Sequence, residues 1–205
     1  MGHRANTPRW VLRLLSEGAQ GLEVDVHLSR GVLVAGHPRE AGRPRLARER
    51  LGSLISSLRV TPPTPLERLL ALLPPGLPLF LDVKQPAPSP EALARVAGRW
   101  AGRLVVVTRL HDTIPALSRL GLEAYASLDH RPSPGELEAL AATGASGLSV
   151  RHTYIDEGLS RLARRLGLRL AAWTVNEPGE AARLRGLVDE VVTDVPALLR
   201  RLLAG

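Results

Sequence analysis

The stretch GLEVDVHL, residues 21–28, alternates apolar and polar side chains with the period of a β-strand. Its aliphatic residues share one face, and Glu23, Asp25 and His27 share the other. The aliphatic face suits packing against helices, so the acidic face is expected to point into the interior of a sheet. Two buried carboxylates are costly unless positive charge offsets them, and hard divalent cations prefer carboxylate oxygens. The stretch therefore predicts a strand that carries an interior cation site.

Strand-like segments alternate with helix-like segments along the rest of the chain. The strand-like segments are residues 21–28, 77–84, 103–108, 123–127, 147–150, 168–174 and 190–193. The helix-like segments are residues 8–17, 65–73, 90–100, 113–120, 135–141, 154–166, 178–186 and 195–203. Strands joined by helices form parallel sheets through right-handed crossovers. With a very short first strand at residues 1–3, the pattern predicts one compact α/β domain over residues 1–205, a (β/α)8 TIM barrel. The alternative is an open doubly wound sheet, but no Gly-rich phosphate loop follows the first strand.

One segment departs from this alternation. Residues 37–65 are rich in Pro, Gly and Arg, with weak helical character over residues 45–58. The segment is long for a plain connection, so we expect an excursion over one end of the barrel.

Composition limits the classes of function. The chain has no cysteine, which excludes disulfide scaffolds, Cys-ligated zinc and a cysteine nucleophile. The net charge of +7 is spread along the sequence, and aromatic residues make up 3%, too few for base-stacking platforms, so we expect no nucleic-acid partner. Heavy use of Arg, Leu, Ala and Pro is typical of codon bias and of a thermophile.

No apolar run approaches the roughly 18 residues of a membrane span, and no export signal is apparent at the start. We therefore expect a cytoplasmic protein with no integral membrane segment. The oligomeric state is left open.

A second strand, LPLFLDVK at residues 77–84, places Asp82 and Lys84 on one face. Barrel active sites lie at the carboxyl ends of the strands, and Glu23, Asp25, Asp82, Lys84 and Trp173 all fall at or near such ends. The three acids are candidate ligands of one divalent cation. The alternatives are buried ion pairs, or strands shifted by one residue so that every charge points outward.

Five blocks in order resemble the glycerophosphodiester phosphodiesterase family. Gly2-His3-Arg4-Ala5-Asn6-Thr7 resembles the family's opening Gly-His-Arg-Gly block, and Glu23-Val24-Asp25-Val26 with Gly36-His37-Pro38 resembles its Glu-x-Asp-Val and His-Asp block. Asp82-Val83-Lys84 is similar to its Glu-x-Lys strand, Trp173–Asn176 is its Trp-Thr-Val-Asn block intact, and residues 187–196 resemble its last block.

The resemblance implies a (β/α)8 barrel that hydrolyses glycerophosphodiesters to glycerol 3-phosphate and an alcohol. It implies a divalent cation, Mg²⁺ or Ca²⁺, held by Glu23, Asp25 and Asp82, and acid–base roles for His3 and His37. It also implies phosphate contacts from Arg4 and Lys84, and a cavity wall formed by Trp173 against the glycerol. In the family the attacking hydroxyl is the glycerol's own, which gives a cyclic phosphate that water then opens.

The departures from the family pattern concern the same blocks. Ala5 replaces a glycine, and a Pro-Glu pair before Asn6 is missing. Pro38 replaces the aspartate of the His-Asp pair, Asp82 is one methylene shorter than the usual glutamate, and Thr108-Arg109 stands where Ser-Phe is usual. The alternative functions are therefore an inactive homologue that binds a phosphate ester without turnover, or action on a different phosphodiester.

Three further positions have both functional and structural interpretations. His152, with Arg151, follows the sixth strand-like segment and either contacts substrate or lies in an exposed polar loop. Asn176 either orients Trp173 or caps the helix near Pro178. Asp194 is a natural N-cap for the last helix.

Overall fold

A computed structural model describes residues 1–37 and 64–203. The helix expected at residues 45–58, and most of the expected excursion, lie outside these residues. The strands are β1 Leu22–Ser29, β2 Val32–Ala35, β3 Thr64–Pro65, β4 Leu79–Val83, β5 Leu104–Thr108, β6 Glu123–Leu128, β7 Gly147–Arg151, β8 Arg169–Trp173 and β9 Glu190–Val191. The helices are α1 Pro8–Ser16, α3 Leu66–Leu70, α4 Pro90–Ala97, α5 Ile114–Arg119, α6 Pro134–Ala142, α7 Glu157–Arg165, α8 Pro178–Leu184 and α9 Pro196–Leu203.

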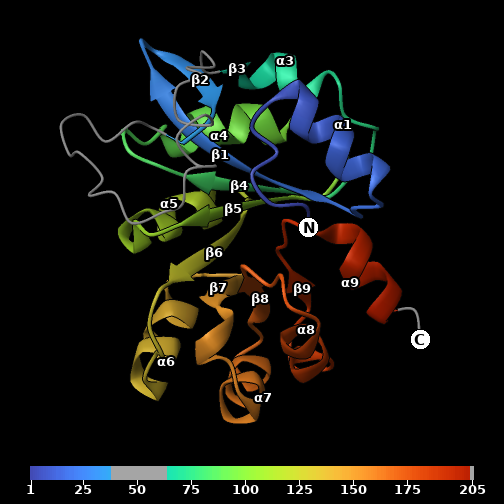
Figure 1. Ribbon diagram of the computed structural model, residues 1–205. Coiled ribbons are helices and arrows are strands. Elements are labelled where there is room, and N and C mark those ends of the chain that lie inside the picture. The colour runs from blue at the N-terminus through green and yellow to red at the C-terminus, as the bar shows by residue number, and fades with distance from the viewer. Residues whose placement is uncertain (38–63, 204–205) are drawn as a thin grey trace, which may run out of the picture.

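Strands β1 and β4 to β9 run parallel, each beside the next, and the short segment at residues 1–3 closes the ring. Gly2 forms parallel bridges to both Leu22 and Thr193. His3 donates its backbone N–H to the carbonyl of Thr193 at 2.8 Å, and Glu23 donates to the carbonyl of Gly2 at 2.8 Å. The expected short first strand is therefore a stub that pairs on both sides. The fold is the predicted (β/α)8 barrel (Figure 1).

Strands β2 and β3 extend the sheet beyond the barrel. β2 pairs antiparallel with β1, with His27 opposite Val34, and β3 pairs antiparallel with β2. The sequence pattern did not predict either strand, because β2 is only four residues long and β3 only two. This hairpin matters for the site because it returns the chain to Asp25, whose carbonyl accepts the N–H of Gly36 at 2.9 Å, just before His37.

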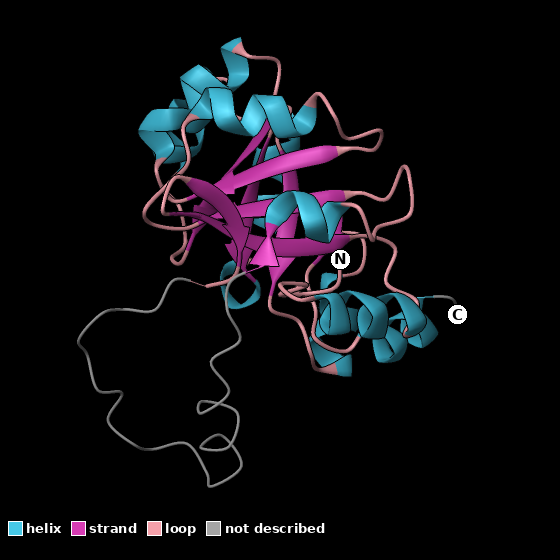
Figure 2. Cartoon of the chain, turned by 90° about the horizontal axis from the view of Figure 1, so that it is seen from above, coloured by secondary structure: helices cyan, strands magenta, loops and turns pink. Residues whose placement is uncertain are grey.

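Two apolar cores hold the barrel together. The larger lies between strands and helices and includes Val24, Leu81 and Leu148. The smaller fills the inside of the ring and includes Phe80 and Tyr125, whose rings meet edge to face at 5.4 Å. Figure 2 shows the strands enclosed by the helices. The alternation read from residues 21–28 is confirmed, because the aliphatic residues of β1 face the helices and the acids face inward.

The helices begin where the sequence supplies caps. Thr7, Ser89, Ser133 and Asp156 each accept a backbone N–H at the start of α1, α4, α6 and α7. Such side-chain acceptors satisfy N–H groups that a helix leaves unpaired in its first turn. In the described ranges, no helix is both long enough and apolar enough to traverse a lipid bilayer.

Candidate active site

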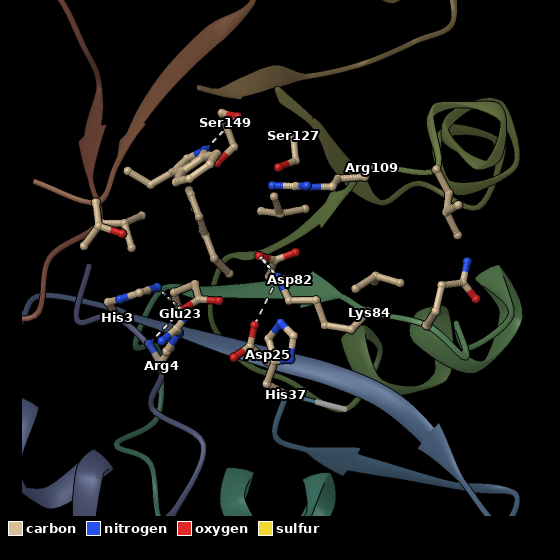
Figure 3. A pocket seen from close by; sticks show the side chains of 18 residues that line it. His3, Arg4, Glu23, Asp25, His37, Asp82, Lys84, Arg109, Ser127 and Ser149 are labelled. Atoms are coloured by element: carbon tan, nitrogen blue, oxygen red, sulfur yellow. Dashed lines mark hydrogen bonds and ion pairs between the residues drawn. The ribbon is translucent and has the colours of Figure 1, made fainter. Parts of the chain in front are cut away.

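A cavity of about 660 Å³ opens at the carboxyl ends of the barrel strands (Figure 3). Eight of the nine residues predicted from the sequence line it: His3, Arg4, Glu23, Asp25, His37, Asp82, Lys84 and Trp173. This volume is typical of a site for a small organic ligand. The parallel ring explains the convergence, because it places every strand end at one mouth.

The three carboxylates meet because of the pairing between β1 and β4. In this register Asp25 lies opposite Asp82, and Glu23 is two residues before Asp25 on the same face. One oxygen from each of the three lies within 4.8 Å of the others. Glu23 and Asp25 are 4% and 2% exposed. Asp82 therefore reaches the cluster although it is shorter than the glutamate of the resembling family.

The electrostatics of this cluster favour a bound cation. Burial, together with the charges of Asp25 and Asp82, raises the pKa of Glu23 well above its ordinary value. Burial also raises the pKa of Asp82, against the opposing effect of Lys84. Three carboxylates thus share one ammonium group, and a divalent cation would supply the missing charge. The all-oxygen donor set suits Mg²⁺ or Ca²⁺.

Lys84 forms ion pairs with two of the three carboxylates. Its Nζ donates to Asp82 at 2.5 Å and lies 3.1 Å from an oxygen of Asp25. Burial acts to lower the pKa of Lys84, but these two carboxylates raise it overall. The ammonium therefore stays charged at the edge of the cluster, where an anionic substrate would meet it.

The turn after the stub strand fixes the carboxylates of β1. Arg4 has a positive φ of 53°, and its backbone N–H donates to Glu23 at 2.7 Å. The amide of Asn6 donates to Asp25 at 2.7 Å and accepts the backbone N–H of Asp25 at 2.9 Å. Sequence reasoning missed Asn6 as a positioning residue, although it lies in the opening motif.

His3 is oriented by a carboxylate from the other end of the chain. Its Nδ1 lies 2.7 Å from Asp194. Asp194 also accepts a hydrogen bond from the amide of Asn176 at 2.8 Å, and its backbone N–H donates to Asn176 at 2.9 Å. Hydrogen bonds from His3 and Asn176 lower the pKa of Asp194, so it is ionised at neutral pH.

This arrangement revises the expectations for Asp194 and Asn176. The Asp194 carboxylate bonds His3 and Asn176, rather than serving as the simple helix cap that the sequence favoured. Residue Glu177 is the N-cap of α8, so Asn176 does not cap that helix. The sequence does show Asp194 at the end of the last strand, where barrel sites lie. It does not show that Asp194 contacts His3, because the two residues are 191 positions apart in the chain.

The second histidine and the tryptophan also line the cavity. His37 follows β2, and Figure 3 shows it and His3 on either side of the acidic cluster. Trp173 ends β8, and its indole N–H donates to the carbonyl of Ser149 at 3.0 Å. This bond fixes the ring as part of the cavity wall.

His152 is the ninth residue, and the structure does not place it in the cavity lining. Its Nδ1 lies 2.9 Å from Glu180 of α8, and Arg183 donates to its carbonyl. The side chain of His152, in the short 3₁₀ turn at His152–Tyr154, thus contacts α8, and a contact between His152 and substrate stays a prediction.

Several lining residues escaped the sequence-based prediction. Arg109 follows β5, Ser127 lies near the end of β6, and Ser149 lies in the middle of β7. Single serines and arginines after strands are too common to stand out before the ring is closed. Arg109 had been noted only as a departure from the family pattern.

No protein-family model matches the chain, and no curated protein matches it either. Several solved structures are similar to the chain. A glycerophosphodiester phosphodiesterase from Thermotoga maritima is 20% identical, with a TM-score of 0.78 over 98% of this chain and 96% of that one. A phosphodiesterase from Oleispira antarctica, in complex with the product sn-glycerol-3-phosphate, is 17% identical, with a TM-score of 0.77 over 100% and 96%.

A glycerophosphodiester phosphodiesterase from Parabacteroides distasonis is 22% identical, with a TM-score of 0.68 over 99% of this chain and 96% of that one. At these identities the likeness concerns the fold. It extends over nearly the whole length of both chains in each pair. The chain therefore has the (β/α)8 fold seen in solved glycerophosphodiester phosphodiesterases.

Proposed function

We propose that this protein is a divalent-cation-dependent phosphodiesterase that hydrolyses glycerophosphodiesters to glycerol 3-phosphate and an alcohol. One observation carries the proposal: the acidic cluster, a lysine, an Asp-oriented histidine and a second histidine line one cavity at the carboxyl ends of the barrel strands. The shared fold, and the product bound in the Oleispira antarctica enzyme, support the choice of substrate class.

Glu23, Asp25 and Asp82 would hold the cation, Mg²⁺ or Ca²⁺. When bound, such an ion offsets negative charge on the oxygens of a phosphodiester. Lys84 and Arg4, which line the same cavity, add fixed positive charge for the phosphate. The buried acids thus have two uses, because they bind the ion and keep Lys84 in place.

The two histidines would transfer the protons of the reaction. With Nδ1–H donated to Asp194, the imidazole of His3 keeps its Nε2 lone pair free to accept a proton. That proton would come from the attacking hydroxyl of the glycerol, whose attack gives a cyclic phosphate that water then opens to glycerol 3-phosphate. Nε2 lies 3.9 Å from Glu23, beside the acidic cluster. His37, from the other side of the cluster, would give a proton to the leaving alcohol. Trp173 would bound the space for the glycerol.

The first experiment measures release of glycerol 3-phosphate from glycerophosphocholine after treatment with a chelator and readdition of Mg²⁺ or Ca²⁺. We expect activity only with a cation, and a loss of at least about 100-fold in Glu23→Gln. Glu67→Gln is the matched control, because Glu67 is exposed and pairs with Arg99 outside the cavity lining.

Two results would count against the proposal. Activity that survives complete removal of metal would remove the role of the acidic cluster. An absence of turnover on every glycerophosphodiester, together with binding of glycerol 3-phosphate, would favour the inactive homologue. The cytoplasmic location and thermophilic origin stay predictions.

A further inference from the structure

Arg109 lies at the mouth of the cavity and makes few contacts with the described residues. It follows β5 and lines the cavity, and its side chain is 62% exposed. Figure 3 shows it reaching over the cavity, beyond Asp82 as seen from Glu23 and Asp25. Its nearest carboxylate oxygen, on Asp129, is 3.8 Å away, and its guanidinium lies 6.0 Å from the ring centre of Trp173. Neither contact is a hydrogen bond.

The carboxylate of Asp129 is already engaged by another arginine. Arg151 donates its Nε to one oxygen of Asp129 and its Nη2 to the other, the latter at 2.9 Å. This paired geometry is the strong mode of arginine–carboxylate binding. Two guanidinium groups thus share one carboxylate, and a positive charge is left over at Arg109.

Two mostly buried serine residues lie on the same wall (Figure 3). Ser127 and Ser149 are 8% and 4% exposed, and both line the cavity. They sit side by side on β6 and β7, because Ser127 is paired in register with Ser149. Within the described residues, neither hydroxyl has a hydrogen-bond partner. Each hydroxyl oxygen therefore opens to the cavity, where it can donate to or accept from a ligand.

This wall lies beyond Asp82 as seen from Glu23 and Asp25, where the phosphodiester would bind, although the charge of Arg109 also acts on Asp82. The single negative charge of a phosphodiester is already met there by the cation, Lys84 and Arg4. Arg109 therefore adds a positive charge that the shared part of the substrate does not require. Trp173, which would bound the space for the glycerol, adjoins this wall, but the glycerol half carries no charge for Arg109 to meet. The group that this charge would meet therefore belongs to the alcohol half.

We propose that Arg109, with Ser127 and Ser149, forms a subsite for a carboxylate on the alcohol half of the substrate. The inference rests on the proposed function and narrows its substrate class to diesters with an acidic alcohol. A planar guanidinium fork matches the two oxygens of a carboxylate, and the serine hydroxyls supply further donors. Arg109 is thus a specificity-determining residue.

The test compares glycerophosphoserine with glycerophosphoethanolamine, which differ only by a carboxylate on the alcohol half. For the metal-replete wild type we expect kcat/KM to be about tenfold or more higher for the serine diester, as a charged hydrogen bond provides. In Arg109→Gln the ratio of the two values should fall close to one. In Ser127→Ala it should fall about threefold.

Two further variants sharpen the comparison. Asp129→Asn removes the competing carboxylate and should raise the ratio. Arg131→Gln is the matched control, because Arg131 is exposed and pairs with Asp156 outside the cavity lining. It should keep the wild-type ratio. Circular dichroism establishes that each variant is folded.

The outcomes separate this inference from the function beneath it. A wild type that hydrolyses both diesters equally well would overturn the subsite and leave the proposed function standing. An equal loss on both substrates in Arg109→Gln, with the ratio unchanged, would also overturn it, because Arg109 would then serve the phosphodiester itself. If neither diester is hydrolysed, the proposed function fails and the subsite with it.

Discussion

At the residue scale, the contact between Asp194 and His3 orients one of the two candidate acid–base groups. Asp194→Asn keeps the shape of the side chain but removes its charge. We expect kcat to fall about 10- to 100-fold with little change in KM, because general acid–base catalysis is worth about 10²–10⁴-fold and this change removes only its positioning part. Steady-state kinetics on glycerophosphocholine measure both constants.

The control for this substitution is Asp112→Asn, at an exposed position outside the cavity lining. It should retain wild-type kinetics. Unchanged kcat in Asp194→Asn would show that His3 does not depend on this carboxylate for its role.

At the scale of elements, Gly147 lets β7 lie close against β6 and β8. A Cβ there would lie 2.6 Å from Cε1 of Tyr125 and 2.7 Å from the carbonyl oxygen of Arg169. Gly147→Ala should therefore lower the free energy of unfolding by about 1–3 kcal/mol, since overpacked sites must shift their neighbours. Urea denaturation measures the change.

Gly135→Ala in α6 is the contrasting substitution. Nothing lies within 4 Å of a Cβ at Gly135. It should raise the free energy of unfolding by about 0.5–1 kcal/mol, because alanine loses less backbone freedom than glycine in a helix. Equal effects of the two substitutions would mean that β7 can move away from Tyr125 and β8 without cost.

At the scale of the whole molecule, the buried Tyr125 inside the barrel lets us predict how the free energy of unfolding changes at alkaline pH. Burial, together with the charge of Glu190, raises the pKa of Tyr125 to about 12, although Arg103 donates a hydrogen bond to its hydroxyl. The folded chain thus keeps the neutral phenol over a range in which the unfolded chain loses its proton. Stability from this source is fully present below about pH 10 and is lost as the pH rises to about 12.

The raised pKa of Tyr125 contributes about 2–3 kcal/mol to the free energy of unfolding, since each pKa unit corresponds to about 1.4 kcal/mol. Tyr125→Phe should remove this part of the pH dependence. Urea unfolding of both proteins at several pH values between 9 and 12 measures it, and the difference between them cancels other titrating groups. Parallel pH profiles would contradict the prediction.

The sequence by itself determined the elements of the barrel, though not the β2–β3 hairpin, and the residue types of the site. The period-two pattern of residues 21–28 assigns each side chain of β1 to a face, because neighbours on a strand point to opposite sides. The same reasoning placed Asp82 and Lys84 inward. The family-like blocks located His3, His37 and Trp173. The assignments of side chains to strand faces use only local geometry, which short stretches of sequence specify, whereas the blocks rest on resemblance to a family.

The tertiary structure decided which of these residues touch. Register between β1 and β4 set Asp25 beside Asp82, and closure of the ring at Gly2 brought Asp194 to His3. It also set Ser127 beside Ser149 on adjacent strands, while the turn after β7 placed His152 against α8. Such contacts join residues far apart in the chain, and they follow from strand pairing around the whole ring, which no local pattern encodes.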